Sequence, residues 1–596
     1  MTTYIAPVRE MMFAMNELAG LEEICGLPGN EEVSADLVEA ILDEAGKFAT
    51  EVLAPINASG DRQGNKWADG VVTTADGFKE AYASFCETGW NGMPASTDFG
   101  GQGLPVTVST AVLEMWKSAN ISFSLCQMLT LGAVEAIAHH GSDALKSTYL
   151  PNMVSGQWTG TMNLTEPQAG SDLAAVRTRA EPRGDGSYAI AGTKIFITWG
   201  EHDMAENIVH LVLARLPDAP PGVKGISLFV VPKFLVNDDG SLGARNDLVC
   251  ASIEHKMGIH ASATAVMAFG EKDGAIGYLV GEANRGLEYM FTMMNHARLN
   301  VGLEGVAISE RAYQQALAYA QERVQGRIIG DKSGDKKPIL HHPDVRRMLM
   351  DMKARTEGTR ALAYYVAGCM DRAKAHPDEA VRKQNQSRLE LLTPVVKGWC
   401  TELAQGVTWN GIQVHGGMGF IEETGACQHM RDARITTIYE GTTAIQANDL
   451  IGRKIAREGG QTMQALIGEL KATQATLAGH ADGGLQKIGQ SLARGIAALE
   501  DATAWLLANY DARPQQAAAG AVPYLKLAGH VVGGWLLGRL ALVAHERMGG
   551  SDAEFHGARL VVARYFAEHV LPEAQALRDA VVDGAESVLA LPEGLF

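Results

Sequence analysis

Residues 162–180 have the sequence MNLTEPQAGSDLAAVRTRA, and the pattern of the chain changes from helical to β-type at this stretch. Short alternating or β-branched runs follow it: YAIAGTKIFIT at 188–198, NIVHLVLARL at 207–216 and GISLFVVPKFL at 225–235. A period of two, bounded by turns rich in Gly, Asp and Pro, is typical of strands with tight connections. We therefore predict a mostly antiparallel β domain over residues 159–280.

The segments on both sides of this domain have helical spacing. Apolar positions recur three and four residues apart in 31–56 and again in 303–324, and an Ala/Leu-rich helical segment follows REGGQT at 457–462. The predicted fold is mainly α with a central β domain. Its four parts are an N-terminal helical domain (1–158), the β domain (159–280), a helical bundle (281–460) and an additional C-terminal helical domain (461–596).

Size and charge exclude several classes of protein. A chain of 596 residues is too long for a single hydrophobic core. Its net charge of −18 argues against nucleic acid or an anionic membrane as a main partner, because both need a basic surface. The seven cysteines form no CxxC pair, which indicates reduced thiols in a cytoplasmic protein without a metal site. The longest apolar stretch, HVVGGWLLGRLALVAH, contains Arg539 and is too short to span a bilayer, so we expect a buried helix and no membrane span.

Two motifs of the β domain have residues that suit a flat, phosphorylated cofactor. Thr165, Gly170 and Ser171 lie in one loop, where hydroxyls and backbone N–H groups can approach a phosphate or a polar ring edge. In KIFITWG at 194–200, Phe196 and Thr198 fall on one side of a strand, where one can cover a ring and the other can bond its edge. The residues of the first motif are also compatible with a tight β connection. Those of the second are also compatible with a core aromatic beside an incidental threonine.

Three further motifs lie in helical surroundings: QERVQGR at 321–327, WNGIQVHGGMGF at 409–420 and RITTIYEGTTAIQANDLIGRKI at 434–455. Gly416 and Gly417 could admit a pyrophosphate closely or could simply end a helix. Glu440, between Tyr439 and Gly441, is by itself compatible with an ordinary solvated loop residue.

The order TEPQAGSD, KIFITWG, ERVQG, QVHGGMGF and IYEGT, over about residues 30–457, resembles the acyl-CoA dehydrogenase flavoprotein family. The resemblance implies a helical domain, a β domain and a four-helix bundle, with FAD at their junction and across a subunit interface. GEHD at 200–203, RVQGR and the added segment from 461 are similar to a long subgroup that includes the 3-methylmercaptopropionyl-CoA dehydrogenases.

The resemblance also assigns roles to individual positions. Ala444 and Pro343 depart from the family pattern and weaken minor FAD contacts, and Phe196 takes the place of a common Trp over the ring. Acyl-CoA contacts fall on Ser171, Arg298, Tyr439 and Gly441. FAD contacts fall on Met162, Leu164, Thr165, Ser171, Phe196, Thr198, Arg323, Gln325, Gln413, Gly417 and Thr442.

Glu440 corresponds to the catalytic base of the family's main branch. The implied activity is FAD-dependent α,β-dehydrogenation of an acyl-CoA to the trans-2-enoyl-CoA, with a fatty acyl or a 3-methylmercaptopropionyl-like substrate. An electron-transferring flavoprotein is the expected electron acceptor. We also expect a homodimer, because the added domain would cover the region where a second dimer packs in shorter relatives.

Two alternatives share the fold. An acyl-CoA oxidase passes electrons to O₂ and usually carries a peroxisomal signal, which the terminal sequence LPEGLF does not resemble. A DNA-binding alkylation-response relative has a basic C-terminal domain. Residues 461–596 contain 10 Lys and Arg against 14 Asp and Glu, a net charge of −4, which is the wrong sign for binding a duplex.

Overall fold

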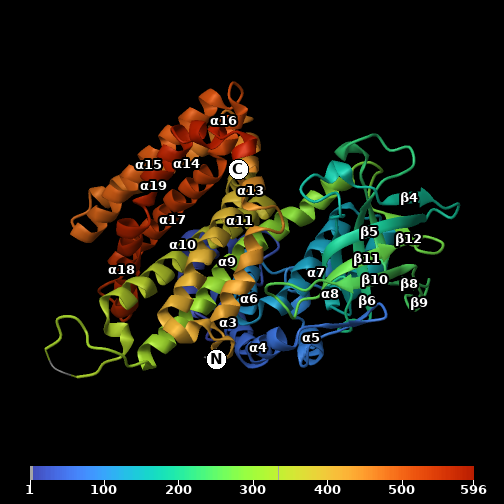
Figure 1. Cartoon of the computed structure of the whole chain (residues 1–596), viewed down its shortest axis with the longest axis horizontal. Helices are drawn as coiled ribbons and strands as arrows, with labels where there is room; N and C mark the ends of the chain where they lie inside the picture. Colours follow the sequence, from blue (N-terminus) through green and yellow to red (C-terminus); the bar gives the residue numbers. More distant parts are fainter. Residues whose placement is uncertain (1–3, 333–334) are drawn as a thin grey trace. The chain divides into compact units, whose positions relative to one another are not determined.

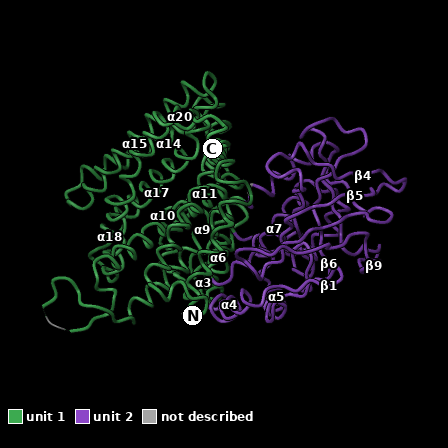
Figure 2. Tube along the Cα trace, in the orientation of Figure 1, with its two compact units in different colours: residues 1–46, 105–118, 298–596 green, residues 47–104, 119–297 purple. Residues whose placement is uncertain are grey.

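The computed structural model describes residues 4–332 and 335–596 and divides the chain into two compact units, shown in Figure 2. Unit 1 is formed by Met1–Gly46, Pro105–Ser118 and Arg298–Phe596, and unit 2 by Lys47–Leu104 and Ala119–Ala297. Each unit combines parts of several predicted domains. The predicted boundaries after residues 158, 280 and 460 therefore stay predictions.

Unit 2 is built around an eight-stranded sheet with the order β10-β11-β5-β12-β7-β6-β3, with β4 paired to β5 (Figure 1). Every named pair in this sheet is antiparallel except β3–β6, so the predicted β domain is confirmed. Two short hairpins, β1–β2 and β8–β9, lie outside it. The strands are β1 (Lys66–Ala68), β2 (Val71–Thr73), β3 (Trp158–Asn163), β4 (Arg179–Pro182), β5 (Tyr188–Thr198), β6 (Asn207–Ala214), β7 (Ser227–Pro232), β8 (Phe234–Val236), β9 (Leu242–Arg245), β10 (Leu248–Ile253), β11 (Thr264–Phe269) and β12 (Ala275–Leu279).

Helix α7 (Ile121–His140) packs on strand β3 of this unit. Its residues are apolar on nearly every face, which is why almost its whole length is buried. Asn120 caps its start by accepting the Phe123 N–H at 3.1 Å. The other helices of the unit are α4 (Ala54–Gln63), α5 (Phe78–Glu87) and α8 (Asp143–Ser155).

Unit 1 contains the long helices α10 (Pro343–Ala375) and α11 (Glu379–His415), which pack along each other. A short turn joins them, and Asp378 caps α11 by accepting the Ala380 N–H at 2.8 Å. Helix α9 (Gly286–Glu322) enters this unit at Arg298. The unit also contains α1 (Val8–Ala14), α2 (Leu21–Cys25), most of α3 (Ala35–Phe48) and α6 (Val106–Ala119), α12 (Ala426–Arg434) and α13 (Thr443–Asn448).

The C-terminal helices of unit 1 surround α17 (Ala521–Glu546), which packs on α10, α11, α15, α18 and α19 (Figure 1). Gly529 and Gly533 face the Trp399 ring, and a Cβ on either would lie within 2.5 Å of a ring atom. Because these positions carry no side chain, α17 approaches α11 closely. The remaining helices here are α14 (Gln461–Ala478), α15 (Gly483–Asn509), α16 (Pro514–Ala519), α18 (Ala553–His569), α19 (Glu573–Val582) and α20 (Ala585–Ala590).

Helices α7 and α17 are the two in the described chain that are long and apolar enough to cross a membrane. Their apolar windows are 89% and 83% buried inside the fold. For α17 this confirms the prediction of a buried helix from its sequence.

Arg360 of α10 is at the centre of a buried ionic cluster in unit 1. Its guanidinium lies 2.6 Å from the Glu114 carboxylate of α6 and 2.7 Å from the Glu310 carboxylate of α9. The Tyr364 hydroxyl also donates to Glu114 at 2.8 Å. One side chain thus connects three helices in the interior of the bundle.

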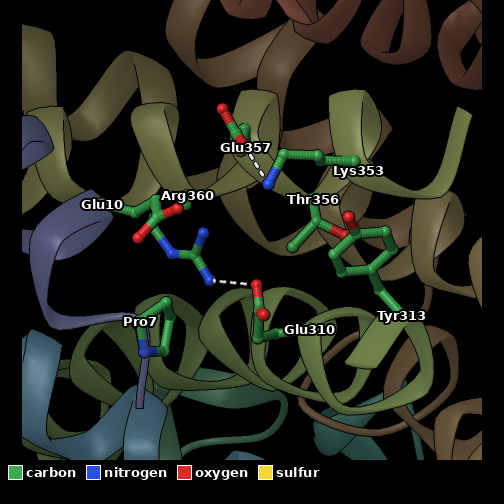
Figure 3. Close-up of a pocket in the computed structure, with 8 residues that line it drawn as sticks. All are labelled: Pro7, Glu10, Glu310, Tyr313, Lys353, Thr356, Glu357 and Arg360. Atoms are coloured by element: carbon green, nitrogen blue, oxygen red, sulfur yellow. Dashed lines mark hydrogen bonds and ion pairs between the residues drawn. The ribbon is translucent and has the colours of Figure 1, made fainter. Parts of the chain in front are cut away.

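A small cavity lies beside this cluster, lined by the residues drawn in Figure 3. Figure 3 shows Arg360 directed at Glu310 of α9 and Lys353 directed at Glu357 of its own helix. Its volume of about 20 Å³ suits one water molecule and is far too small for a flavin or an acyl chain. We therefore regard this cavity as part of the structural core.

Candidate active site

Glu440 lies in a tight turn that directly precedes α13. Its φ of +55° and the φ of +89° at Gly441 place two successive residues in the left-handed region. Glycine adopts this conformation readily, whereas a residue with a side chain pays roughly 1–2 kcal/mol for it. Thr442 then caps α13 by accepting the Ile445 N–H at 3.3 Å. An unfavourable conformation that the surrounding structure maintains is characteristic of functional sites.

Side chains from three elements hold this turn. Gln446 of α13 donates through Nε2 to the Glu440 carbonyl at 3.0 Å. Lys397 of α11 donates through Nζ to the Gly441 carbonyl at 2.7 Å. On the other side of Glu440, the Tyr439 hydroxyl donates a hydrogen bond to the carboxylate of Glu304 on α9.

Buried charges surround the Glu440 carboxyl group, which is itself half-buried. Arg298 of α9 pairs with Asp449 at 3.4 Å and is 5% exposed. Glu304 lies 3.5 Å from the Lys117 ammonium of α6, and neither side chain is exposed. This arrangement combines carboxylates and cations within the bundle, where their interactions are little screened by water.

The pKa of Glu440 is raised to about 7, mainly by burial and to a smaller extent by the negative charge of Glu304. The positive charges of Arg298 and Lys397 oppose this effect on the Glu440 pKa. Burial also lowers the pKa of Lys397 to about 8. A carboxylate with a pKa near neutrality is matched to removing a proton at physiological pH, because the deprotonated form is both populated and basic.

Other carboxylates in the sequence motifs are less suited to this role. Glu422 and Glu423 are exposed, and Glu422 forms an ion pair with Arg431 at 3.0 Å. Glu166 is buried, but Lys194 and the Thr178 hydroxyl donate to it and outweigh the effect of burial, so its pKa falls to about 2. Such a carboxylate is too weak a base near neutral pH.

Glu166 instead organises the TEPQAGSD loop of unit 2. Its carboxylate accepts the N–H groups of Arg177 and Thr178 at 2.8 and 3.0 Å, and Lys194 Nζ at 2.8 Å. Lys194 Nζ also donates to the Leu164 carbonyl at 3.0 Å. The loop is therefore folded around one buried ion pair.

The predicted cofactor residues of unit 2 lie around this loop and strand β5. The Ile195 N–H donates to the Thr165 carbonyl at 2.9 Å, which brings the loop against β5. Met162, Leu164, Thr165 and Thr198 are half-buried, and Ser171 is exposed.

Phe196 is 58% exposed and has a φ of +60° at a bulge in β5. The bulge interrupts the alternation of the strand and turns this ring toward solvent. An exposed aromatic ring in a costly backbone conformation, beside hydroxyls and a small-residue loop, fits the flat ring of the flavin that the resemblance predicts.

The predicted cofactor residues of unit 1 lie at two separate places. Arg323, Gln325, Gln413 and Gly417 are exposed, at the neighbouring ends of α9 and α11, where Tyr319 stacks on His415 at 4.5 Å. A Cβ at Gly417 would meet nothing within 4 Å, so packing inside the chain does not require glycine there.

Thr442 lies at the Glu440 turn, which contacts α11 through Lys397. From Lys397 to Gln413 is 16 residues, or about 24 Å along a helix. The structure thus does not bring Thr442 together with the other four. An extended cofactor, or cofactors of two subunits, would be needed for all five to contact FAD.

Arg298 and Tyr439 were predicted to contact the acyl-CoA. Arg298 is buried against Asp449, and the Tyr439 hydroxyl is engaged by Glu304. Their substrate contacts stay predictions. Glu304, Lys397 and Lys194 were not predicted as site residues, although the sequence contains a signal for Lys397. Lys397 stands in the apolar run LLTPVVKGWC, where a charged residue is unusual unless it has a partner.

Four domain families match successive parts of the chain. The N-terminal domain of acyl-CoA dehydrogenase matches residues 36–157, its middle domain 161–271 and its C-terminal domain 284–455. An acetyl-CoA dehydrogenase C-terminal-like domain matches residues 466–592.

Similar proteins support the same assignment. The 3-methylmercaptopropionyl-CoA dehydrogenase of Ruegeria pomeroyi is 50% identical over 588 residues, which cover 98% of this chain and 99% of that one. The broad-specificity linear acyl-CoA dehydrogenase FadE5 of Mycobacterium tuberculosis is 35% identical over 100% of both chains. The crystal structure of an acyl-CoA dehydrogenase complexed with FAD from Bacillus anthracis has the same fold, with a TM-score of 0.75 and 20% identity over 96% of this chain and 91% of that one. This chain therefore belongs to the acyl-CoA dehydrogenase family and is an FAD-dependent oxidoreductase.

Proposed function

We propose that this enzyme dehydrogenates a short, 3-methylmercaptopropionyl-like acyl-CoA to its trans-2-enoyl-CoA, with Glu440 as the base. The observation that carries the role of Glu440 is its turn. The backbone of Glu440 is left-handed, Lys397 and Gln446 hold the carbonyls of this turn, and the pKa of the Glu440 carboxyl group is raised to about 7. The 50% identity to the Ruegeria pomeroyi enzyme over nearly the whole of both chains supports this acyl group over a long fatty chain.

In the proposed reaction, Glu440 takes the α proton of the thioester. Bound FAD would supply the acceptor for the β hydrogen, which leaves as hydride. Loss of the α proton and the β hydride leaves a C=C bond between the α and β carbons. The buried cations Arg298 and Lys397 keep part of the Glu440 population ionised despite its burial. A carboxylate that is removed from water by burial is a stronger base than one in water.

Met162, Leu164, Thr165, Ser171, Phe196 and Thr198 of unit 2 are proposed FAD contacts, and Thr442 of unit 1 is a separate proposed FAD contact. Arg323, Gln325, Gln413 and Gly417 would meet the FAD of a second subunit, because they lie at the neighbouring ends of α9 and α11, about 24 Å along α11 from the Lys397 that contacts the Glu440 turn. Ser171, Arg298, Tyr439 and Gly441 are proposed acyl-CoA contacts.

A homodimer is part of this proposal. Large apolar side chains are exposed beside the glycine motif, among them Trp409 at 60% and Phe420 at 85%. Contiguous exposed apolar patches are typical of protein interfaces, so we propose that these side chains lie between the subunits. Light scattering of the FAD-loaded enzyme tests this assignment, and a monomer would contradict it.

We further propose that an electron-transferring flavoprotein takes the electrons and that the enzyme works in the cytoplasm, where its seven free cysteines would remain reduced. Rapid, stoichiometric peroxide formation with the best substrate would contradict the acceptor and favour an oxidase.

The function is tested by anaerobic bleaching of the flavin with a panel of acyl-CoAs. We expect fastest reduction with 3-methylmercaptopropionyl-CoA and other short chains. Glu440→Gln should bind FAD and acyl-CoA but reduce its flavin more slowly by at least the roughly 10²–10⁴-fold typical of losing a general base. Near wild-type reduction in Glu440→Gln would show that another residue is the base, and fastest reduction with a long linear chain would show that the proposed substrate class is wrong.

A further inference from the structure

The buried ammonium of Lys397 makes a contact that the proposed reaction does not use directly. Its side chain comes from the middle of α11, and the residue is 0% exposed. Among the described residues its hydrogen-bond acceptor is the carbonyl of Gly441, the residue that follows the candidate base. Burying a lysine ammonium that donates a hydrogen bond to a backbone carbonyl costs desolvation free energy. Packing alone therefore does not explain why a lysine occupies this position.

A second buried group reaches the same turn from the other side. The Glu304 carboxylate accepts the Tyr439 hydroxyl, and Tyr439 immediately precedes Glu440. Glu304 is in turn fixed beside the Lys117 ammonium at 3.5 Å. The residues on both sides of Glu440 are therefore attached to charged side chains on different helices, α11 and α9.

Glu440 needs such support because its own backbone conformation is unfavourable. At a φ of +55° a non-glycine residue relaxes to a right-handed or extended conformation unless its neighbours prevent it. A relaxation of this peptide would displace the carboxylate from the position it now occupies. Losing about 1 Å of alignment in a reacting group can reduce a rate about 10²-fold.

We propose that Lys397 and Glu304 are positioning residues of the YEGT turn, which hold Glu440 in its left-handed conformation and give its carboxylate a fixed pair of opposite charges. This inference rests on the proposed role of Glu440. It adds two residues that contact neither the substrate nor the flavin in the proposed reaction. The two side chains have opposite charges. Removing each should therefore change the titration of Glu440 in opposite directions.

Among the described residues, the charged side chains that act on Glu440 from the helices are Arg298 and Glu304 on α9 and Lys397 on α11. Lys397→Met removes a positive charge, so the pKa of Glu440 should rise and the acid limb of the pH profile should move to higher pH. Glu304→Gln removes a negative charge but still accepts the Tyr439 hydroxyl, so the acid limb should move to lower pH. Arg298 is left unchanged in both variants.

The experiment uses the FAD-loaded full-length enzyme and measures the rate of flavin reduction against pH, together with the affinity for acyl-CoA. We expect Lys397→Met to lower the maximal rate about 10²-fold with an acyl-CoA affinity close to wild type. Lys397→Gln keeps a donor without the charge, so its maximal rate should recover in part while its acid limb stays shifted. Infrared difference spectra, assigned by the loss of the carboxyl band in Glu440→Gln, report the same titration without catalysis.

The matched control is Glu379→Gln. Glu379 is also on α11 and pairs with Lys383 at 2.6 Å on the exposed surface, about 27 Å along the helix from Lys397. Its pH profile should match wild type. Unshifted profiles in both Lys397→Met and Glu304→Gln, or shifts in the same direction, would overturn the inference. If Glu440→Gln reduced its flavin normally, the proposed function would fail instead, so the two failures are distinguishable.

Discussion

The ammonium of Lys194 and the carboxylate of Glu166 lie 2.8 Å apart beneath the TEPQAGSD loop, and neither side chain is more than 3% exposed. The Lys194 ammonium also donates a hydrogen bond to the Leu164 carbonyl. This ion pair therefore determines the shape of a loop that we propose to contact the flavin. Its contribution to cofactor binding is indirect, since both charged groups face the inside of the loop.

Replacing Lys194 by Met should weaken both the loop and the cofactor site. The substitution leaves a buried carboxylate without its cation, a change that typically costs about 3–5 kcal/mol of stability. We expect a lower melting temperature and FAD affinity reduced by at least about tenfold, measured by flavin fluorescence during titration of the apoprotein. Lys272→Met, in the turn before β12, is the surface control. An unchanged FAD affinity would show that the ion pair does not support the flavin site.

The activity should depend on pH through Glu440. The reaction needs the carboxylate form, and the pKa of this group is raised to about 7 from an ordinary value of about 4.3. Below about pH 7 the rate of flavin reduction should fall tenfold for each unit of pH, and above it the rate should reach a plateau. Stopped-flow measurements over pH 5–9 test this. A rate that stayed constant down to about pH 5 would mean that the base has an ordinary carboxyl pKa.

The same shift affects stability with a definite sign. A carboxyl group whose pKa is higher in the folded than in the unfolded state binds its proton more tightly when folded. Glu440 therefore favours folding most at low pH, and this contribution is lost as the pH rises from about 4.3 to about 7. Glu440→Gln should remove this part of the pH dependence of unfolding. The comparison needs enzyme without substrate, because a ligand would add its own linkage.

The sequence predicted much of the fold because its signals are local. Alternation identified the strands around β5, and the apolar composition of 530–545 identified the buried part of α17. The parallel pair β3–β6 was not predicted, because pairing between distant strands leaves no local pattern. Glu304 was missed for the same reason. The charge of Lys397 within an apolar run indicates that it has a partner but does not identify that partner, because only the fold brings three helices to the YEGT turn. The position of Phe196 depends on a bulge, which simple alternation does not predict.

The ionic cluster of Arg360 should be important for stability rather than activity. Arg360→Met would leave Glu114 and Glu310 buried without their shared cation, at a cost of about 3–5 kcal/mol. Denaturant unfolding of the FAD-loaded enzyme measures this loss. The control, Arg347→Met, breaks a 2.8 Å pair with Asp344 in which both side chains are more than half exposed, so it should cost less than about 1 kcal/mol. Equal losses in the two variants would contradict the importance we assign to the buried cluster.

Removal of the C-terminal helices should change the association of the enzyme. Trp399 of α11 is fully buried, and Gly529 and Gly533 of α17 lie directly against its ring. Its indole N–H also donates to His530 at 3.0 Å. Truncation after residue 460 would expose this ring and the adjacent apolar face of α10 and α11, which must then be covered by another chain.

We therefore expect the truncated protein to form a tetramer or an aggregate in light-scattering measurements, in contrast to the proposed dimer of the full chain. Truncation after Gly584 is the matched control. It removes α20 and the terminal residues, which are mostly exposed, and should leave the association unchanged. A monodisperse dimer after truncation at 460 would mean that the α11 face does not require cover. The C-terminal helices would then need another explanation, because the contacts of Trp399 would not determine the assembly.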